Sequence, residues 1–425
     1  MKNLFGLLLA LASLLTIGCS SVPKVKVGKT TLAPTPLAIS VGPSGYAASL
    51  KQMKITPTVP VFIMSTRNLE ESPRGGIDPF GTGRLIQANP HFAIAEVSIG
   101  ANVSEETLMS ETLTDVNRKR TKIAVKNVKV LPGISQTQVS WRHFSTSNQN
   151  HSWFTAIKKQ LDKGASREIV IFVHGYNTLL TSNTELLGEL YHYRARDGAV
   201  INFEWPSGGR VIDYFKDKGN ASHSTLYFRT LLSSIARQTQ AKSIRIIGHS
   251  AGCPIVVNAL RELRLWDKDL TPSQLQNKYH IRQVVLAAPD MDLMEFNNAV
   301  FDRFYEMSDH TAVYFSPNDG ALALSQFVFG NRRLGRALGT LREFERESFL
   351  ASKRLDLINV SYSGSNSGDL FGHMYFQNDP WITSDIGLSM FRFKPEDRGL
   401  VRSTDGLFWE FPNDYPKRLK DIVLP

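Results

Sequence analysis

The sequence predicts an α/β domain in which helices cover a mostly parallel, doubly wound sheet, with a β-rich flank on its N-terminal side. Two observations predict this fold. From about residue 146 onward, short apolar runs alternate with longer amphipathic stretches, which is the pattern of strands buried on both faces and separated by helices. Upstream, residues 92–99 and 123–130 alternate roughly between apolar and polar side chains, as half-exposed antiparallel strands do.

The predicted core elements alternate along the chain. Ligands of such sheets bind at the carboxyl ends of the strands, so the residues directly after each apolar run are candidates for a functional site. We predict core strands at 169–173, 199–205, 243–247, 284–288, 312–315 and 355–360, helices at 186–196, 226–237 and 255–265, an upstream strand at 59–65 and a loop at 66–90.

The N-terminus indicates export. Lys2 precedes an apolar run, 4–15, that is too short to span a bilayer, which takes about 20 residues. The run leads into Leu15-Thr16-Ile17-Gly18-Cys19, which resembles a bacterial lipobox, although Thr16 replaces the usual Leu. We therefore predict a lipoprotein signal peptide over 1–18 and a lipid on Cys19. A plain secretory signal and an uncleaved anchor are the alternatives.

These features predict a lipid-anchored protein of the bacterial cell envelope. Ser20, in place of Asp, directly after the cysteine resembles the signals that sort lipoproteins to the outer membrane. The predicted location is therefore the periplasmic side of the outer membrane. Residues 19–57 are rich in Pro, Gly, Ser, Thr and Lys and predict a flexible tether. The predicted domain is 58–398, made of a β-rich flank (58–145) and a catalytic core (146–384), followed by a C-terminal tail (399–425).

Composition narrows the classes of function. With Cys19 lipidated, Cys253 has no partner, so a disulfide framework is excluded. No cysteine cluster could bind zinc, and we expect neither metal nor cofactor. The net charge is +10, and basic residues are dense over 332–354. We interpret them as a solvated helix face, with attraction to anionic lipid or envelope polymer as the alternative. We expect no nucleic-acid partner.

The predicted nucleophile is Ser250. It lies in Gly248-His249-Ser250-Ala251-Gly252, between an apolar run and a helical stretch. This context is that of the nucleophile elbow in the α/β-hydrolase fold, where small flanking residues let a strained turn present the hydroxyl. A tight structural turn is the alternative. We expect His249 to pack under the turn and Cys253 to be a core residue.

The predicted oxyanion hole uses two backbone amides, those of Ala251 and Tyr176. Residues 169–173 run into His174-Gly175-Tyr176-Asn177, and a strand ending in His-Gly resembles the loop that supplies the second donor in this fold. We expect the His174 side chain to shape that loop.

The base and the acid follow the nucleophile in chain order. His280, His310 and His373 are the histidines after Ser250, and the first two precede their strands, at the wrong end. His373 lies in a Gly- and Ser-rich loop beyond the last strand and is the predicted base.

Asp319 is the predicted acid, because it follows the run 312–315 and could orient His373. Asp290 and Asp292 follow the preceding strand and are the rivals. The segment from Trp205 to Ala221 is either a pocket wall or a surface connection.

The combined motifs resemble one bacterial α/β-hydrolase family, the domain of unknown function numbered nine hundred. The resemblance covers about 59–384, and the family's apparent triad falls at Ser250, Asp319 and His373. Ala251 departs from the Met that the family often has. The motifs that carry the resemblance are His174-Gly-Tyr-Asn177, Phe203-Glu-Trp-Pro-Ser207, Gly248–Gly252, Ala287-Ala-Pro-Asp290, Ser316-Pro-Asn-Asp319 and Gly372-His-Met-Tyr-Phe376.

The sequence therefore predicts a serine hydrolase of lipid or small carboxylic esters, acting through an acyl-enzyme. Its partners would be the ester substrate and, through the N-terminal lipid, a membrane. The alternatives are a non-catalytic envelope protein that binds ligands on a hydrolase scaffold, and an acyltransferase or amidase with the same triad.

Overall fold

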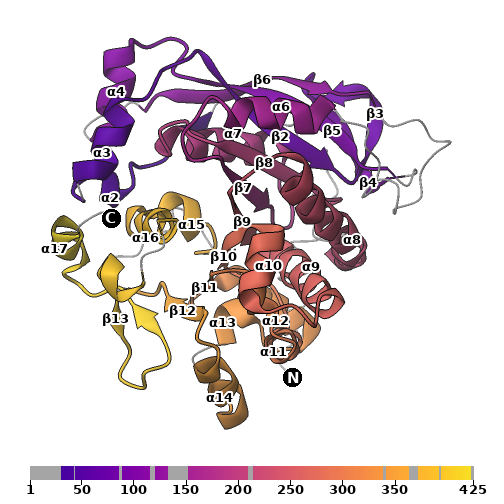
Figure 1. Cartoon of the computed structure of the whole chain (residues 1–425), viewed down its shortest axis with the longest axis vertical. Coiled ribbons are helices and arrows are strands. Elements are labelled where there is room, and N and C mark those ends of the chain that lie inside the picture. Colours follow the sequence, from indigo (N-terminus) through magenta and orange to yellow (C-terminus); the bar gives the residue numbers. More distant parts are fainter. Residues whose placement is uncertain are drawn as a thin grey trace, which may run out of the picture.

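The fold is built around one large mixed sheet, which runs across the molecule in Figure 1. The computed structural model describes residues 30–42, 44–85, 89–114, 120–132, 152–208, 214–337, 341–362, 372–391 and 394–422. Within these ranges the main sheet has twelve strands in the order β1-β6-β5-β2-β8-β7-β9-β10-β11-β12-β14-β13. Cys19 and the predicted signal peptide lie outside the described residues.

The centre of the sheet is parallel, which confirms the predicted fold class. Every neighbouring pair from β2 to β12 is parallel. The chain moves from β7 to β8 on one side and then to β9 on the other. Such a reversal of direction opens a crevice at the carboxyl ends of the strands. The strands are β2 (Thr58–Ser65), β7 (Glu168–Val173), β8 (Ala199–Glu204), β9 (Ser243–His249), β10 (Ile281–Ala287), β11 (His310–Phe315) and β12 (Leu355–Asn359).

The β-rich flank extends this same sheet. Strands β5 (His91–Ile99) and β6 (Lys122–Val130) add to β2 in antiparallel fashion. The prediction of a loop at 66–90 was wrong over most of that range. β3 (Arg67–Arg74) and β4 (Asp78–Arg84) form an antiparallel hairpin, because its glycines mark a tight turn, where Gly75 and Gly76 have φ of 60° and 75°.

The flexible tether predicted for 19–57 was wrong from residue 30 onward. Strand β1 (Thr30–Thr31) pairs with β6, and helices α2 (Leu37–Ser40) and α3 (Ser44–Lys51) follow. Leu32 and Leu50 are buried in the core, and the amide of Ala38 donates to Oγ of Ser384 at 2.9 Å. The sparse apolar residues of this polar segment therefore anchor it to the domain.

The predicted C-terminal tail also belongs to the domain. Strands β13 (Val401–Arg402) and β14 (Trp409–Glu410) form a hairpin that joins β12. Tyr415 in α17 (Tyr415–Arg418) is fully buried. Because these residues complete one edge of the apolar core, the domain ends well beyond residue 398.

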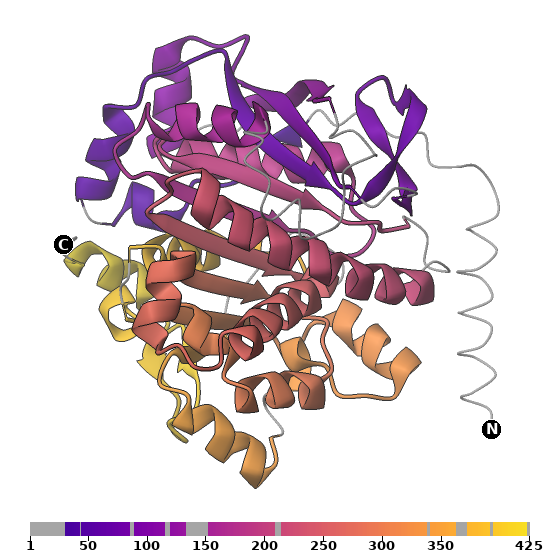
Figure 2. The ribbon, with the colours of Figure 1, turned by 45° about the vertical axis from the view of Figure 1, so that its right-hand side comes forward.

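Helices cover both faces of the sheet, and each face has its own apolar cluster. Figure 2 shows α8 and α9 lying in front of the strands. None of the described helices is both long and apolar enough to cross a bilayer. One face carries α6 (Ser152–Leu161), α8 (Tyr214–Gln238), α9 (Cys253–Trp266), α10 (Pro272–Tyr279), α11 (Leu293–Phe301) and α14 (Glu343–Ala351), and the other α4 (Glu105–Leu113), α7 (Leu180–Tyr193), α15 (Tyr375–Asn378) and α16 (Pro380–Ser389).

Candidate active site

The turn after β9 is strained and tightly packed. Ser250 has a φ of 50°, a left-handed conformation that costs energy for a residue with a side chain. A Cβ at Gly252 would lie 2.4 Å from the carbonyl oxygens of Val173 and His174. Only glycine fits there, because the turn packs directly against the end of β7. The geometry is that of a nucleophile elbow.

The loop after β7 lies against the same turn. A Cβ at Gly175 would be 2.9 Å from both the Cβ of Ser250 and Nδ1 of His249. The missing side chain therefore lets this loop approach the serine closely. Tyr176 and Ala251, whose amides are the predicted oxyanion donors, line one cavity beside the elbow.

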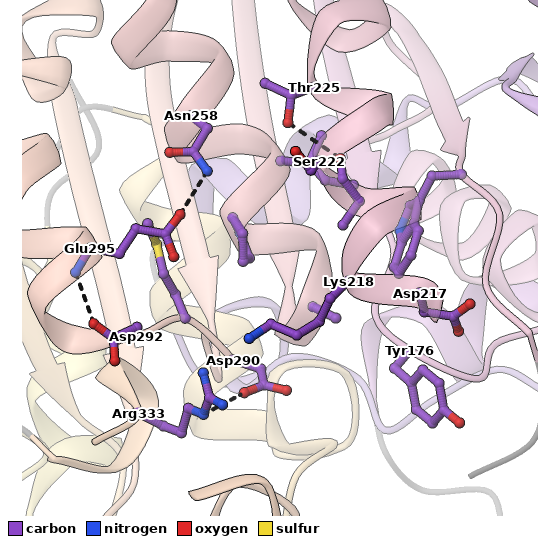
Figure 3. Close-up of a pocket in the computed structure, with 16 residues that line it drawn as sticks. Tyr176, Asp217, Lys218, Ser222, Thr225, Asn258, Asp290, Asp292, Glu295 and Arg333 are labelled. Atoms are coloured by element: carbon purple, nitrogen blue, oxygen red, sulfur yellow. Dashed lines mark hydrogen bonds and ion pairs between the residues drawn. The ribbon is translucent and has the colours of Figure 1, made fainter. Parts of the chain in front are cut away.

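This cavity has a volume of about 230 Å³ and is rich in charged and polar groups (Figure 3). The Lys218 side chain points toward Asp290 and Arg333 in that view. Trp205, Asp217, Lys218 and Ala221 all line it, so both ends of the segment from 205 to 221 contribute to its wall. Its further polar lining residues are Ser222, Thr225, Asn258, Asp292 and Glu295.

His373 is held by Asp319. Its Nδ1 lies 2.7 Å from Oδ2 of Asp319, a carboxylate with no solvent exposure. The other oxygen, Oδ1, accepts from the amide of Leu322 at 2.9 Å and caps α12 (Gly320–Phe329). Both oxygens are thus engaged, so the carboxylate has little freedom to rotate. With Nδ1 facing the acid, Nε2 is the ring nitrogen that can exchange protons with a serine.

Ring contacts bring His373 to the elbow. Its centroid lies 4.9 Å from that of His249, the residue before Ser250. The His249 ring stacks on Phe376 at 4.4 Å. Burial lowers the pKa of His249 well below its ordinary value, and nearby His373 lowers it further. A neutral His249 therefore supports the turn by packing, as expected. Its contact with His373 brings the imidazole held by Asp319 next to the residue that precedes Ser250.

The rival carboxylates have other partners. Asp290 accepts from Oγ of Ser325 at 2.8 Å, and its Oδ1 lies 3.3 Å from Nε of the buried Arg333. Asp292 caps α11 by accepting from the amides of Met294 and Glu295. Asp319, by contrast, makes a direct 2.7 Å contact with Nδ1 of His373.

A buried polar network supports the loop after β7, and most of this network was missed from sequence. His174 stacks on Trp205 with ring centroids 5.2 Å apart, and the Trp205 indole donates to its carbonyl oxygen at 2.8 Å. Behind them, Glu204 pairs with Arg67 at 2.9 Å. Burial alone would raise the pKa of Glu204. The His174 ring and the Arg67 guanidinium outweigh burial and lower that pKa to about 2. A carboxylate inside an apolar run was the signal that could have revealed this network.

Among the residues that the structure describes, no group of three or more His, Cys, Asp or Glu side chains could hold a metal ion. Cys253 is fully buried, and burial raises the pKa of its thiol well above the ordinary value. It packs in the core, as the sequence predicted.

The elbow, the imidazole held by a carboxylate and the doubly wound sheet together define an α/β hydrolase. The chain belongs to the family described as alpha/beta hydrolase of unknown function (DUF900), which matches residues 149–390. The family resemblance seen in the sequence is thereby confirmed.

The chain is also similar to three further proteins, over part of its length. An uncharacterized protein of Nostoc sp., alr1448, is 24% identical over 221 residues, covering 40% of this chain and 57% of the relative. A predicted CIB-like hydrolase from Thermoplasma acidophilum is 15% identical with a TM-score of 0.32, covering 54% of this chain and 87% of that one. Esterase B from Lactobacillus rhamnosis is 14% identical with a TM-score of 0.29, and the match covers 53% of this chain and 74% of the esterase chain.

Proposed function

We propose that this α/β hydrolase cleaves carboxylic esters through Ser250, His373 and Asp319. The observation that carries the proposal is the 2.7 Å contact between His373 and Asp319, together with a φ of 50° at Ser250 that is typical of the nucleophile in an elbow. A serine hydroxyl is a weak nucleophile until a base removes its proton. A buried carboxylate behind the imidazole is the arrangement that supplies such a base.

The proposed reaction has two halves. His373 takes the proton of Ser250 while the serine oxygen attacks the ester carbonyl. The resulting oxyanion is stabilised by the amides of Ala251 and Tyr176, each worth roughly 10²–10³ in rate. The carbon–oxygen bond to the alcohol then breaks, and His373 gives that alcohol its proton. Water attacks the acyl-enzyme by the same route and frees Ser250.

The cavity next to the oxyanion amides supports a short, polar substrate within this class. An engineered apolar cavity of about 150 Å³ holds one benzene molecule. The cavity beside the elbow, at about 230 Å³, therefore suits a group somewhat larger than benzene. Lys218, Asp290 and Glu295 line it. A long fatty chain would desolvate the exposed ammonium of Lys218 without pairing it, which is costly. We therefore propose a small ester in place of a long-chain lipid.

A fluorophosphonate probe tests the chemistry. We expect the folded protein to be labelled, and labelling to be lost in Ser250→Ala. Ser273→Ala removes an exposed hydroxyl from α10 and should label like the unaltered protein. No labelling of folded protein would instead favour a binding protein on a hydrolase scaffold. Products formed with an added alcohol or amine distinguish hydrolysis from acyl transfer.

We also propose that the protein is anchored to the envelope membrane through Cys19. The lipobox-like sequence before this residue supports the proposal. Metabolic labelling with an alkyne fatty acid should mark the chain, and Cys19→Ser should abolish the label and release the protein from membranes. Labelling that survives in Cys19→Ser would contradict it.

A further inference from the structure

A second, larger cavity lies at the amino ends of the parallel strands, whereas Ser250 lies at their carboxyl ends. We call it the amino-edge cavity. Its volume is about 620 Å³. It is lined by residues where strands begin, including Arg282 at the start of β10 and His310, the first residue of β11. Asp319 follows the other end of β11. Because that strand has six residues, at roughly 3.3 Å each, about 20 Å separates the two sites.

The lining of this amino-edge cavity is strongly basic. Its cationic side chains outnumber its carboxylates by six to three, in contrast to the cavity beside Ser250, where acidic groups predominate. A concave surface of one sign concentrates the electric field and attracts counter-ions. The cations are Arg245, Arg282, Lys353, Arg354, Lys394 and Arg402, and the carboxylates are Asp309, Asp356 and Glu396.

Two of the six cations already have carboxylate partners within the protein. Arg245 pairs with Glu168 at 2.5 Å, and Arg282 with Asp309 at 3.3 Å. The carboxylate of Asp356 is shared between His310 and the Trp409 indole, which donates at 2.9 Å. Both partly buried carboxylates of the cavity, Asp309 and Asp356, therefore have partners within the protein.

The other four cations pair with no carboxylate in the described part of the chain. Arg354 donates to the carbonyl oxygen of Ser308 at 3.0 Å, and Arg402 lies over the Trp409 ring at 4.1 Å. Lys353 and Lys394 are exposed. Neutral contacts thus hold two guanidinium groups in place while leaving their charge uncompensated.

We propose that this amino-edge cavity binds a phosphate-bearing ligand. These four cations outnumber Glu396, the remaining carboxylate of the lining, and leave the cavity positive. Phosphoryl groups carry up to two negative charges each and three acceptor oxygens. One water molecule takes up about 30 Å³ of liquid volume, so a cavity of about 620 Å³ is larger than a single phosphate needs. The ligand is therefore a diphosphate or a phosphate joined to a polar group, either free or as a lipid headgroup. This site does not depend on the chemistry proposed for Ser250.

Inorganic pyrophosphate is the probe for the site. Calorimetric titration of the full chain at low ionic strength should show saturable binding, and Lys353→Gln/Lys394→Gln should weaken it at least tenfold. Both lysines are exposed, so the fold should be retained. Lys159→Gln/Lys268→Gln removes two equally exposed charges elsewhere and should leave the affinity within twofold. Absence of saturable binding, or equal weakening in both double variants, would overturn the proposal.

A second measurement identifies the source of the phosphate. Vesicles of phosphatidylglycerol and phosphatidylcholine are compared for retention of the full chain, with and without pyrophosphate. Retention on phosphatidylglycerol that pyrophosphate reverses, and that the Lys353/Lys394 variant lacks, assigns a lipid headgroup. Equal retention on both vesicles, together with saturable pyrophosphate binding, assigns a free ligand. Ser250→Ala should bind pyrophosphate normally, so failure of the catalytic proposal leaves this result unaffected.

Discussion

Asp319 holds His373 with one carboxylate oxygen and the N-terminus of α12 with the other. One buried side chain thus combines the catalytic role proposed here with a structural role, and the two can be separated by mutation. Asn is as good a helix cap as Asp, whereas Ala is not.

We expect Asp319→Asn to lower kcat/KM for a good ester by roughly 10³–10⁴-fold, because the amide no longer stabilises the imidazolium. Its stability should change little. Asp319→Ala should lose the same activity and a further ~1 kcal/mol of stability. Ester kinetics and urea unfolding measure the two effects. Ser104→Ala removes the cap of α4, where Oγ accepts from Thr107 at 3.1 Å, and should lose stability alone. An Asp319→Asn enzyme of near-normal activity would remove Asp319 from the triad.

A second prediction concerns the elbow. Gly252→Ala should abolish activity, because the new Cβ would meet two backbone oxygens at 2.4 Å and the turn must shift to relieve the collision. Gly406 has a φ of 70° and open space around it. Gly406→Ala should therefore cost about 1 kcal/mol of stability from conformation alone and keep full activity. Comparable activity in the two variants would show that the turn tolerates displacement.

The third prediction concerns acyl length. p-Nitrophenyl acetate and butyrate should be cleaved with kcat/KM at least tenfold above that of the palmitate ester, because a long chain would have to desolvate the charges of the cavity. Lys218→Met replaces the ammonium with an apolar end and should raise the hexanoate-to-butyrate ratio several-fold. Lys216 is exposed on the same helix but does not line the cavity, so Lys216→Met should leave the ratio unchanged. A preference for palmitate would reverse the proposed substrate class.

The parts of the fold that the sequence predicted are those with strong local signals. β7 is apolar after Glu168, and β9 is mostly apolar around Arg245. The elbow glycines are required by a local turn. The hairpin β13–β14 and the segment from residue 30 were missed because their order depends on contacts with distant strands. Two-residue strands such as β1 carry almost no periodicity of their own.

The choice between carboxylates shows the same limit within the site. Asp290 and Asp319 both follow an apolar run, so local sequence does not distinguish them. Their partners do, because Asp290 faces Arg333 while Asp319 faces His373, 54 residues away in the chain. Likewise, the pairing of Glu204 with Arg67 joins residues 137 positions apart. Such contacts are set by the topology of the sheet, which periodicity does not reveal.

The fourth prediction concerns the buried pair of Glu204 and Arg67 and the stability of the folded protein in acid. The pKa of Glu204 is lowered from 4.5 to about 2, so the folded state binds its proton less readily than the unfolded chain. The resulting stabilisation of about 3 kcal/mol is fully present above pH 4.5. It is lost as the pH falls from there toward 2.

Glu204→Gln should therefore lower the free energy of unfolding at pH 7 by roughly 3–5 kcal/mol, since Arg67 keeps a buried charge without its partner. The gap between the variant and the unaltered protein should narrow between pH 4.5 and 3, where Glu204 itself begins to lose its advantage. Urea unfolding at pH 7, 5, 4 and 3 measures it. Glu262, a partly exposed partner of Arg229 at 2.9 Å, provides the control, and Glu262→Gln should cost less than about 1 kcal/mol at each pH. A gap for Glu204→Gln that stays constant from pH 7 to 3 would mean that the carboxylate titrates alike in the folded and unfolded chain, and that the network holds the loop by shape alone.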